Sequence, residues 1–167
     1  YDGDSDLDLF LLNSASPNQL MQNQGDATFF IRSLDMGIAQ DIHYSLGAIW
    51  DDTDRDGDLD LLVLNSGMGP LDSPPWEGTD SFEPAGPNRL YINQGSDGYE
   101  LSNLSVQGPE PYSCCAAFVD VDHDGYRDLY IVNDFGMHVQ GNQIFMNTES
   151  DGFLPREELG LGLGIYG

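Results

Sequence analysis

Aspartates at alternate positions recur three times in this chain of 167 residues, each time just before a hydrophobic run that ends in Asn. The clearest copy, DTDRDGDLD, spans residues 52–60 and is followed by LLVLN. A second copy, DVDHDGYRD, spans residues 120–128, and residues 1–8, YDGDSDLD, carry the later part of the same pattern. Such closely spaced carboxylates repel one another unless a cation lies among them. Oxygen ligands at this density, on a loop tightened by glycine, are what Ca²⁺ requires.

The order of candidate ligands in these loops differs from that of the helix–loop–helix calcium site. That site closes with a bidentate Glu at position twelve, whereas position twelve is Val63 in one loop and Ile131 in the other. Both lie within a hydrophobic run, and an aspartate stands at position nine instead. A β-hairpin loop can bring positions one, three, five and nine around one ion, with the backbone carbonyl of position seven as a further ligand. Glycine at position six allows the positive φ that such a tight turn needs, and Ser5 takes this position in the first copy.

The sequence therefore predicts calcium loops of one design. Asp and Gly also favour turns without any metal, but three copies in matching register argue against that simpler explanation. Mg²⁺ fits less well, because it keeps its waters and seldom fills an all-protein cage. The first copy lacks a counterpart of Asp52, so we expect two or three Ca²⁺ ions. The candidate ligands, with position seven contributing its backbone oxygen, are Asp2, Asp4, Asp6, Asp8, Asp52, Asp54, Asp56, Asp58, Asp60, Asp120, Asp122, Asp124, Tyr126 and Asp128.

The charge of the chain narrows the classes of partner. Twenty-nine Asp and Glu against five Lys and Arg give a formal net charge of −24, which argues against nucleic acid and anionic membrane surfaces. Hydrophobic residues make up 40% of the chain and fall in short runs, so we expect a folded protein rather than a disordered acidic one. No segment approaches the roughly 20 apolar residues of a membrane span, and we expect no membrane insertion.

The elements that must position these loops repeat along the chain. Each loop leads into a strand, then into a motif of the form Asn-x-apolar-x-x-Asn at 18–23, 88–93 and 142–147, and then into a polar turn followed by an aromatic residue. Short β-branched and aromatic runs broken by Gly, Asn and Pro predict about four strands per unit. Four strands in each unit of about 40 to 50 residues are typical of a β-propeller blade.

We therefore predict an all-β fold of about three four-stranded blades, forming part of one propeller domain over residues 1–167. The expected blades span 1–45, 46–113 and 114–167, and the second includes an insert at 66–87. A propeller ring needs about four to eight blades, so we expect the chain to be an interior piece of a longer protein that supplies the rest.

The repeats resemble a known family. The aspartate loop, the strand NRLYIN at 88–93 and the turn that follows it are similar to the FG-GAP/VCBS repeats of integrin-α-type β-propellers. Residues 120–167 resemble the cartilage acidic protein-like subgroup, in which an ASPIC/UnbV domain often follows such blades. The resemblance implies a secreted or surface-exposed propeller of seven blades, with periplasmic location as an alternative. It also implies calcium ligands at positions one, three, five and nine of the second and third loops.

Two functions of different classes follow from the sequence. The first is a non-enzymatic extracellular propeller that uses structural calcium and acts in adhesion, in binding a protein or glycan, or in surface assembly. The alternative is the scaffold of a secreted carbohydrate-active enzyme, a lyase or hydrolase, but the chain shows no catalytic motif and few basic residues. The insert at 66–87 either contacts a partner or packs over its own blade.

The two cysteines, Cys114 and Cys115, are adjacent. No Cys-x-x-Cys spacing accompanies them, so they do not indicate a zinc site. We expect two small, buried strand residues, with a strained vicinal disulfide as the alternative.

Overall fold

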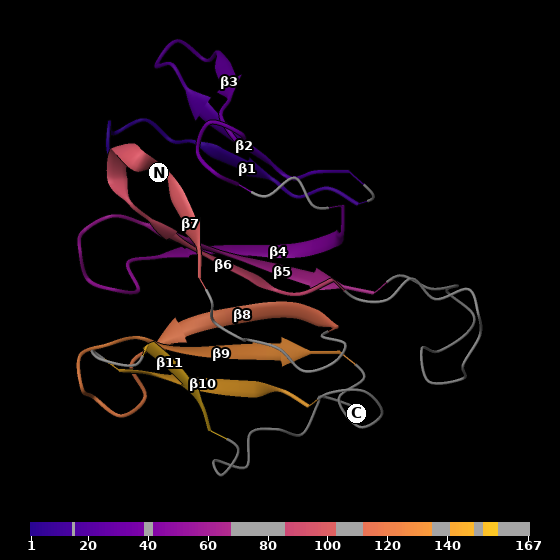
Figure 1. Cartoon of the computed structure of the whole chain (residues 1–167), viewed down its shortest axis with the longest axis vertical. Helices are drawn as coiled ribbons and strands as arrows, with labels where there is room; N and C mark the ends of the chain where they lie inside the picture. Colours follow the sequence, from indigo (N-terminus) through magenta and orange to yellow (C-terminus); the bar gives the residue numbers. More distant parts are fainter. Residues whose placement is uncertain are drawn as a thin grey trace.

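Three antiparallel sheets follow one another along the long axis of the molecule (Figure 1). The computed structural model describes residues 1–14, 16–38, 42–67, 86–102, 112–134, 141–148 and 152–156. Eleven strands and one short 3-10 turn account for its regular structure. This confirms the prediction of an all-β fold made of successive blades, which in this chain form no closed ring.

Each sheet is a simple meander in which strands adjacent in sequence pair with one another. The first sheet, with three strands among the described residues, contains β1 (Leu9–Leu11), β2 (Gln19–Asn23) and β3 (Phe29–Ile31). The second contains β4 (Tyr44–Asp51), β5 (Asp60–Ser66), β6 (Arg89–Asn93), the turn η2 (Gly95–Asp97) and β7 (Tyr99–Leu101). The third contains β8 (Ser113–Val119), β9 (Asp128–Asn133), β10 (Gln143–Thr148) and β11 (Gly152–Pro155).

Strand β5 lies at the centre of the molecule and is buried along its whole length. Its side chains alternate between two hydrophobic cores, as a strand with period two requires. Leu61 and Val63 face the first sheet, whereas Leu62 and Leu64 face the third. A continuous apolar run is what a strand covered on both faces needs, and this explains the sequence LLVL directly after the aspartate loop.

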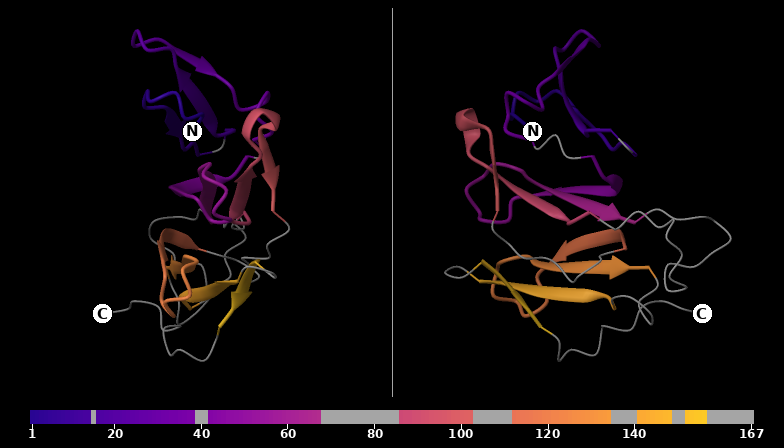
Figure 2. Two further views of the ribbon diagram at one scale, coloured as in Figure 1. Left: turned by 90° about the vertical axis from the view of Figure 1, so that its left-hand side faces the viewer. Right: turned by 45° about the vertical axis from the view of Figure 1, so that its right-hand side comes forward.

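The two cores hold neighbouring sheets together. Between the first and second sheets, Leu20, Tyr91 and Tyr99 are buried, and the rings of Phe10 and Trp50 meet edge to face with centroids 6.2 Å apart. Between the second and third sheets, the buried side chains are Leu62, Leu64, Leu90, Leu129, Ile131, Phe145 and Phe153. The views in Figure 2 show the same succession of sheets from two other directions.

A chain of buried hydrogen bonds also joins successive sheets at the ends of β5 and β9. The amide of Asn88 donates to Ser113 Oγ (2.8 Å), and that hydroxyl donates to Asn133 Oδ1 (2.7 Å). The same arrangement links the first sheet to the second through Asn18, Ser45 and Asn65. This gives a physical role to the Asn residues that end each hydrophobic run and begin each Asn-x-apolar-x-x-Asn motif.

Parts of two sequence-based expectations fall outside the described residues. Most of the predicted insert, residues 68–85, lies there, and so does the segment 157–167. The expectation that Cys114 and Cys115 are buried is wrong, because both cysteines are exposed on β8.

Candidate metal centres in the aspartate loops

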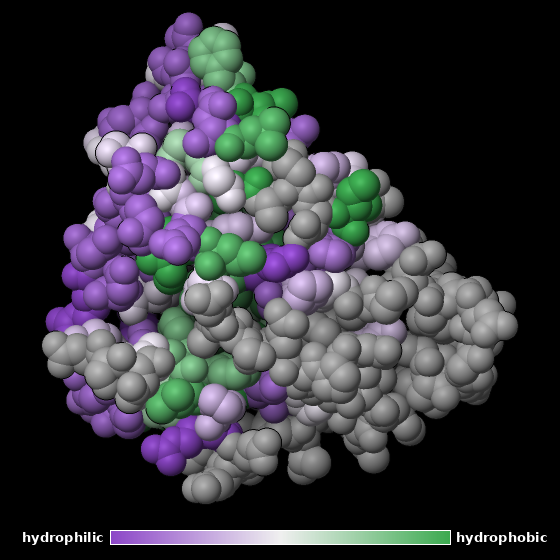
Figure 3. Space-filling model, in the orientation of Figure 1, coloured by the Kyte–Doolittle hydropathy of each residue, from purple (hydrophilic) through white to green (hydrophobic). Residues whose placement is uncertain are grey.

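All three aspartate loops lie at one edge of the stacked sheets. Residues 52–59 connect β4 to β5, residues 120–127 connect β8 to β9, and residues 1–8 lead into β1 (Figure 1). The space-filling view shows hydrophilic side chains gathered along this same edge, at the left of Figure 3. Because successive sheets repeat the same connection, the fold places the loops side by side instead of scattering the charge.

The three loops share one backbone conformation. Position six has a positive φ in every copy, at 97° for Gly57, 95° for Gly125 and 78° for Ser5. The prediction of a left-handed residue at this position is therefore confirmed, even where serine replaces glycine. Position four is also left-handed, with φ of 66° at Arg55 and 64° at His123. The sequence analysis missed position four, although Gly3 in the first copy occupies it.

Carboxylates within each loop hold this conformation by accepting backbone hydrogen bonds. The position-three carboxylate accepts from the N–H of position five, and position five accepts from position seven, in all three copies. In the second loop the distances from Asp54 and Asp56 to these nitrogens are 3.3 Å and 2.8 Å. The opening Asp52 accepts from the N–H of Gly57 at 3.2 Å, and Asp120 accepts from Gly125 in the same way. The aspartates at positions one, three and five are thereby turned toward one point.

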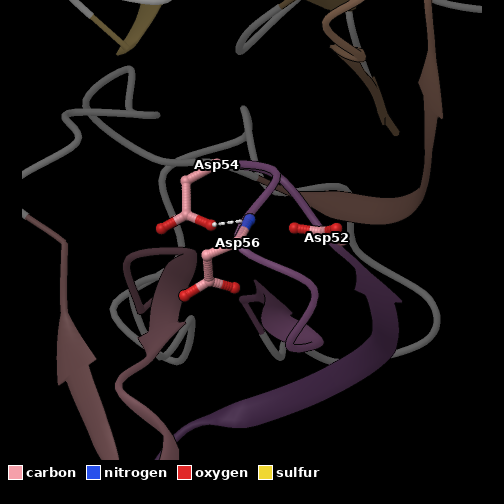
Figure 4. Close-up of side chains that lie close together, drawn as sticks. All are labelled: Asp52, Asp54 and Asp56. Carbon is pink, nitrogen blue, oxygen red and sulfur yellow. Dashed lines mark hydrogen bonds between the residues drawn. The ribbon is translucent and has the colours of Figure 1, made fainter.

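Two of the loops bring three carboxylates close enough to share a cation. Asp52, Asp54 and Asp56 each offer an oxygen within 4.8 Å of the others, and Figure 4 shows the three side chains on their loop. Asp120, Asp122 and Asp124 form the matching trio in the third loop. Ca²⁺ binds oxygen at about 2.3–2.6 Å, so two ligands of one ion lie up to about 5 Å apart. The spacing of both trios therefore suits calcium.

An unsatisfied oxygen in each trio supports the same fit. Asp52 Oδ1 and Asp120 Oδ1 are shielded from solvent and have no hydrogen-bond partner. A buried carboxylate oxygen without a partner is costly, and a bound cation would satisfy it. The same atom is orphaned at the same position of two loops, so the feature belongs to the design of the repeat. Residues of both trios thus fit Ca²⁺, which would offset most of their charge.

The aspartate at position nine lies outside both trios and has a different environment. Asp60 is 1% exposed and Asp128 is 0% exposed. One oxygen of Asp60 accepts from the Thr53 main-chain N–H (2.9 Å) and hydroxyl, and the other accepts from the Asn93 N–H (2.8 Å). Asp128 makes the equivalent backbone bonds to Val121 and Asn147. Position nine therefore ties the loop to the third strand of the meander, a role that sequence reasoning did not foresee.

Burial affects the protonation of these carboxyl groups. Loss of hydration raises the pKa of Asp60 above its ordinary value, and the hydrogen bonds from Thr53 and Asn93 offset part of that rise. Burial also raises the pKa of Asp54, with the Asp60 charge as the next cause. Loss of hydration is therefore the leading cause at both carboxyl groups.

The first loop differs from the other two. Asp2 and Asp4 occupy positions three and five, Asp6 position seven, and Asp8 position nine. Asp8 is also tied down: it accepts from the amino-terminal ammonium group of Tyr1 (2.7 Å), as a buried ion pair, and from the main-chain N–H of Asn23 (2.9 Å). Among the described residues, no trio of metal-binding carboxylates forms here, since position one has no counterpart. Its role as a metal site remains a prediction.

Side chains of the loops also link the second and third sheets. The Arg127 guanidinium bonds Asp51 at 2.7 Å, and the Arg55 guanidinium lies over the Tyr126 ring at 5.0 Å from its centroid. The Asn147 amide donates to the Thr53 carbonyl at 2.8 Å. Position seven of the third loop, Tyr126, thus contacts the second loop through its ring, while Asp58 stays exposed at the same position.

The geometry now agrees with two comparisons. Residues 1–63 match the model of the FG-GAP-like repeat. Over these residues the chain is similar to the FG-GAP-like repeat. It is also 25% identical over 142 residues to cartilage acidic protein 1 of Xenopus tropicalis, an alignment that covers 83% of this chain and 19% of that protein. The chain therefore spans about a fifth of the length of this relative. The similarity agrees with the cartilage acidic protein-like subgroup suggested by the sequence.

Proposed function

We propose that this chain is the calcium-stabilised part of an extracellular β-propeller that binds a protein or glycan partner, in adhesion or in surface assembly. Ca²⁺ is structural in this proposal, because it offsets most of the charge of the three carboxylates and fixes the loop between two strands. Metal binding then contributes directly to the free energy of folding. Each of the second and third loops holds one ion, and the first loop is the candidate for another.

The observation that carries the calcium proposal is the pair of matching trios with their orphaned oxygens. Turn formation alone would account for the glycines and for the bonds from carboxylate to backbone. It would not account for a buried, unpartnered oxygen at position one of both loops. The ligand set in this proposal is positions one, three and five with the carbonyl of position seven. A carboxylate oxygen that accepts one hydrogen bond has a second lone pair. The aspartate of position nine is a further ligand where it binds the ion through that lone pair and keeps its backbone hydrogen bonds.

Exposed apolar faces at both ends of the stack support the proposal of a larger propeller. Leu9 and Leu11 are 45% and 43% exposed on the outer face of the first sheet. Val119 on the third sheet is 45% exposed. Further blades from the same longer chain would cover these faces in the way that the first and third sheets cover β5. Among the described residues, no helix is long and apolar enough to span a bilayer.

The repeat family and the name of the relative support a binding role in the extracellular space. The name cartilage acidic protein 1 describes no enzymatic activity. The acidic edge of this chain favours a partner with basic or calcium-bridged groups over nucleic acid. A screen of extracellular proteins and glycans, performed with calcium and again with chelator, tests this part of the proposal. A partner that is retained only with calcium supports it, and binding to DNA or RNA contradicts it.

Titration calorimetry tests the metal assignment directly. We expect Asp56→Asn to remove one calcium equivalent and Asp124→Asn to remove another, because each variant loses one member of a trio. Asp26→Asn, an exposed aspartate in the β2–β3 turn, is the matched control and should keep the full stoichiometry. An unchanged stoichiometry in both loop variants would refute the assignment.

A further inference from the structure

Strand β8 carries an irregularity at its two cysteines. Ser113 pairs with Asn133 and Cys115 pairs with Val132, so Cys114 is an extra residue without a partner of its own in β9. The second sheet has the same β-bulge, with Leu46 as the extra residue between Ser45 and Gly47. The bulge is therefore a feature of the repeat, and only the third sheet places cysteines on it.

The bulge brings the two thiols together. Neighbouring side chains in a regular strand point to opposite faces of the sheet, which keeps them apart. In β8 the Sγ atoms of Cys114 and Cys115 lie 4.0 Å from each other. Both cysteines are exposed, and neither is in a disulfide. This is an accessible pair of thiols held in mutual contact by backbone geometry.

The two thiols differ in their surroundings. Cys114 Sγ donates a hydrogen bond to the Val132 carbonyl at 3.4 Å. Burial, followed by the neighbouring Cys115, raises the pKa of the Cys114 thiol. Cys114 therefore holds its proton in the resting state and must release it, together with its bond to Val132, before it reacts.

We propose that Cys114 and Cys115 form a reversible redox pair that closes to a vicinal disulfide by exchange with a small-molecule disulfide. Cys114 loses its proton, attacks one sulfur of the small disulfide, forms a mixed disulfide and releases one thiolate. Cys115 then loses its proton and attacks the Cys114 sulfur, which expels the second thiolate. The two cysteines lose two electrons and two protons, and the small disulfide is reduced to two thiols.

The geometry also explains why the closed form should reopen easily. The Cα atoms of adjacent residues are about 3.8 Å apart across a trans peptide, whereas most disulfides join Cα atoms about 4.4–6.8 Å apart. Closing the ring therefore introduces strain, and it removes the hydrogen bond from Cys114 to Val132. Strained, exposed disulfides are the ones that are readily reduced. The pair suits a reversible switch better than a permanent cross-link.

Accessibility of the bulge does not depend on the third sheet being at the end of the stack. Leu46 occupies the place of Cys114 in the second sheet, which has a sheet on either side, and it is still 55% exposed. We therefore expect Cys114 to be reachable in a larger propeller too.

The test is peptide mapping of the full-length protein after treatment with oxidised glutathione, with free thiols alkylated before digestion. We expect the peptide that contains both cysteines to be unalkylated and lighter by two hydrogens, and to return to the dialkylated form after reduced glutathione. Cys115→Ser should instead accumulate a glutathione adduct on Cys114, and faster than Cys114→Ser accumulates one on Cys115. Ring closure should be slower in urea, where the bulge is lost.

Three results would overturn the proposal. The first is a peptide that stays fully alkylated after the treatment, which would mean that the pair does not react. The second is a stable glutathione adduct in the wild-type protein, which would mean that Cys115 does not complete the exchange. The third is equal rates of ring closure in folded and urea-unfolded protein, which would mean that the bulge has no part in it.

Discussion

The first and second sheets contain the same sequence pattern, but they differ in how many neighbouring sheets cover them. Leu9 and Leu61 occupy the same place in the repeat, directly after the aspartate of position nine. Leu61 is fully buried because the first sheet covers it, whereas Leu9 is 45% exposed on the outer face. Burial is therefore set by the neighbouring sheet and not by the strand itself. The loops differ similarly, since the second has a complete trio and the first lacks its opening member.

Replacing the two leucines should give the largest contrast. In the isolated chain we expect Leu61→Ala to lower the free energy of unfolding by about 2–5 kcal/mol, as is usual for buried leucines. Leu9→Ala should cost less than about 1 kcal/mol, because its side chain loses less contact. Urea denaturation of both variants measures the difference. Equal costs would show that Leu9 is already packed in solution, for example against a second copy of the chain.

The same two leucine replacements also compare the first and second sheets in the full-length protein. If a further blade covers the first sheet there, the cost of Leu9→Ala should rise toward that of Leu61→Ala. A cost that stays below about 1 kcal/mol would contradict the proposal that another blade packs on this face.

The position-nine aspartates should give the next largest effect. Asp60→Asn places an amide donor where the buried carboxylate accepts hydrogen bonds from Thr53 and Asn93, and we expect a loss of about 2–3 kcal/mol. Asp128→Asn should cost less, because Asp128 accepts from two backbone donors and Asp60 from three donor groups. Thermal unfolding in chelator isolates these costs from metal binding. Asp56→Asn, at an exposed position, should change stability by no more than about 0.5 kcal/mol under those conditions.

Removing the Tyr99 hydroxyl should give a smaller effect than replacing Leu61 or Asp60. Its hydroxyl donates to the Leu59 carbonyl at 3.1 Å and accepts from the Asn93 amide at 3.3 Å, and burial raises its pKa. The first and third sheets have Phe29 and Phe153 at the register position of Tyr99, opposite the corresponding Asn. Tyr99→Phe should therefore fold normally and cost about 1 kcal/mol, measured by denaturation. A cost above about 3 kcal/mol would exceed what the loss of these two hydrogen bonds explains.

Much of this architecture could be predicted from the sequence because local signals agree with one another. Short β-branched and aromatic runs predicted the strands, and repeated Gly at position six predicted the left-handed turn of residues such as Gly57. Matching register between the three copies predicted loops of one design. These features depend on short-range steric and hydrophobic preferences. One copy of the repeat is enough to indicate them, and the other copies strengthen the prediction.

The rest depended on contacts between residues far apart in the chain. The link from Asn88 through Ser113 to Asn133 crosses two sheets, and no local pattern reveals it. Asp60 ties its loop to β6 through the N–H of Asn93, which lies 33 residues later in the chain. Local sequence does not reveal this contact. The contact between the two cysteines depends on a β-bulge at Cys114. The sequence indicates this bulge only through the matching place of Cys114 and Leu46 in their repeats. The sequence predicted that small and polar residues lie in strands, but it did not predict which residues contact them from other strands and sheets.

The most direct test of structural calcium is the melting temperature of the protein with calcium and with chelator, compared between wild type and a variant carrying both Asp54→Asn and Asp122→Asn. The account predicts that chelator lowers the melting temperature of the wild type markedly, by several degrees for each ion bound. The double variant should melt near the chelator-treated wild type and respond weakly to calcium. A wild-type melting temperature that does not change with chelator would contradict the central claim.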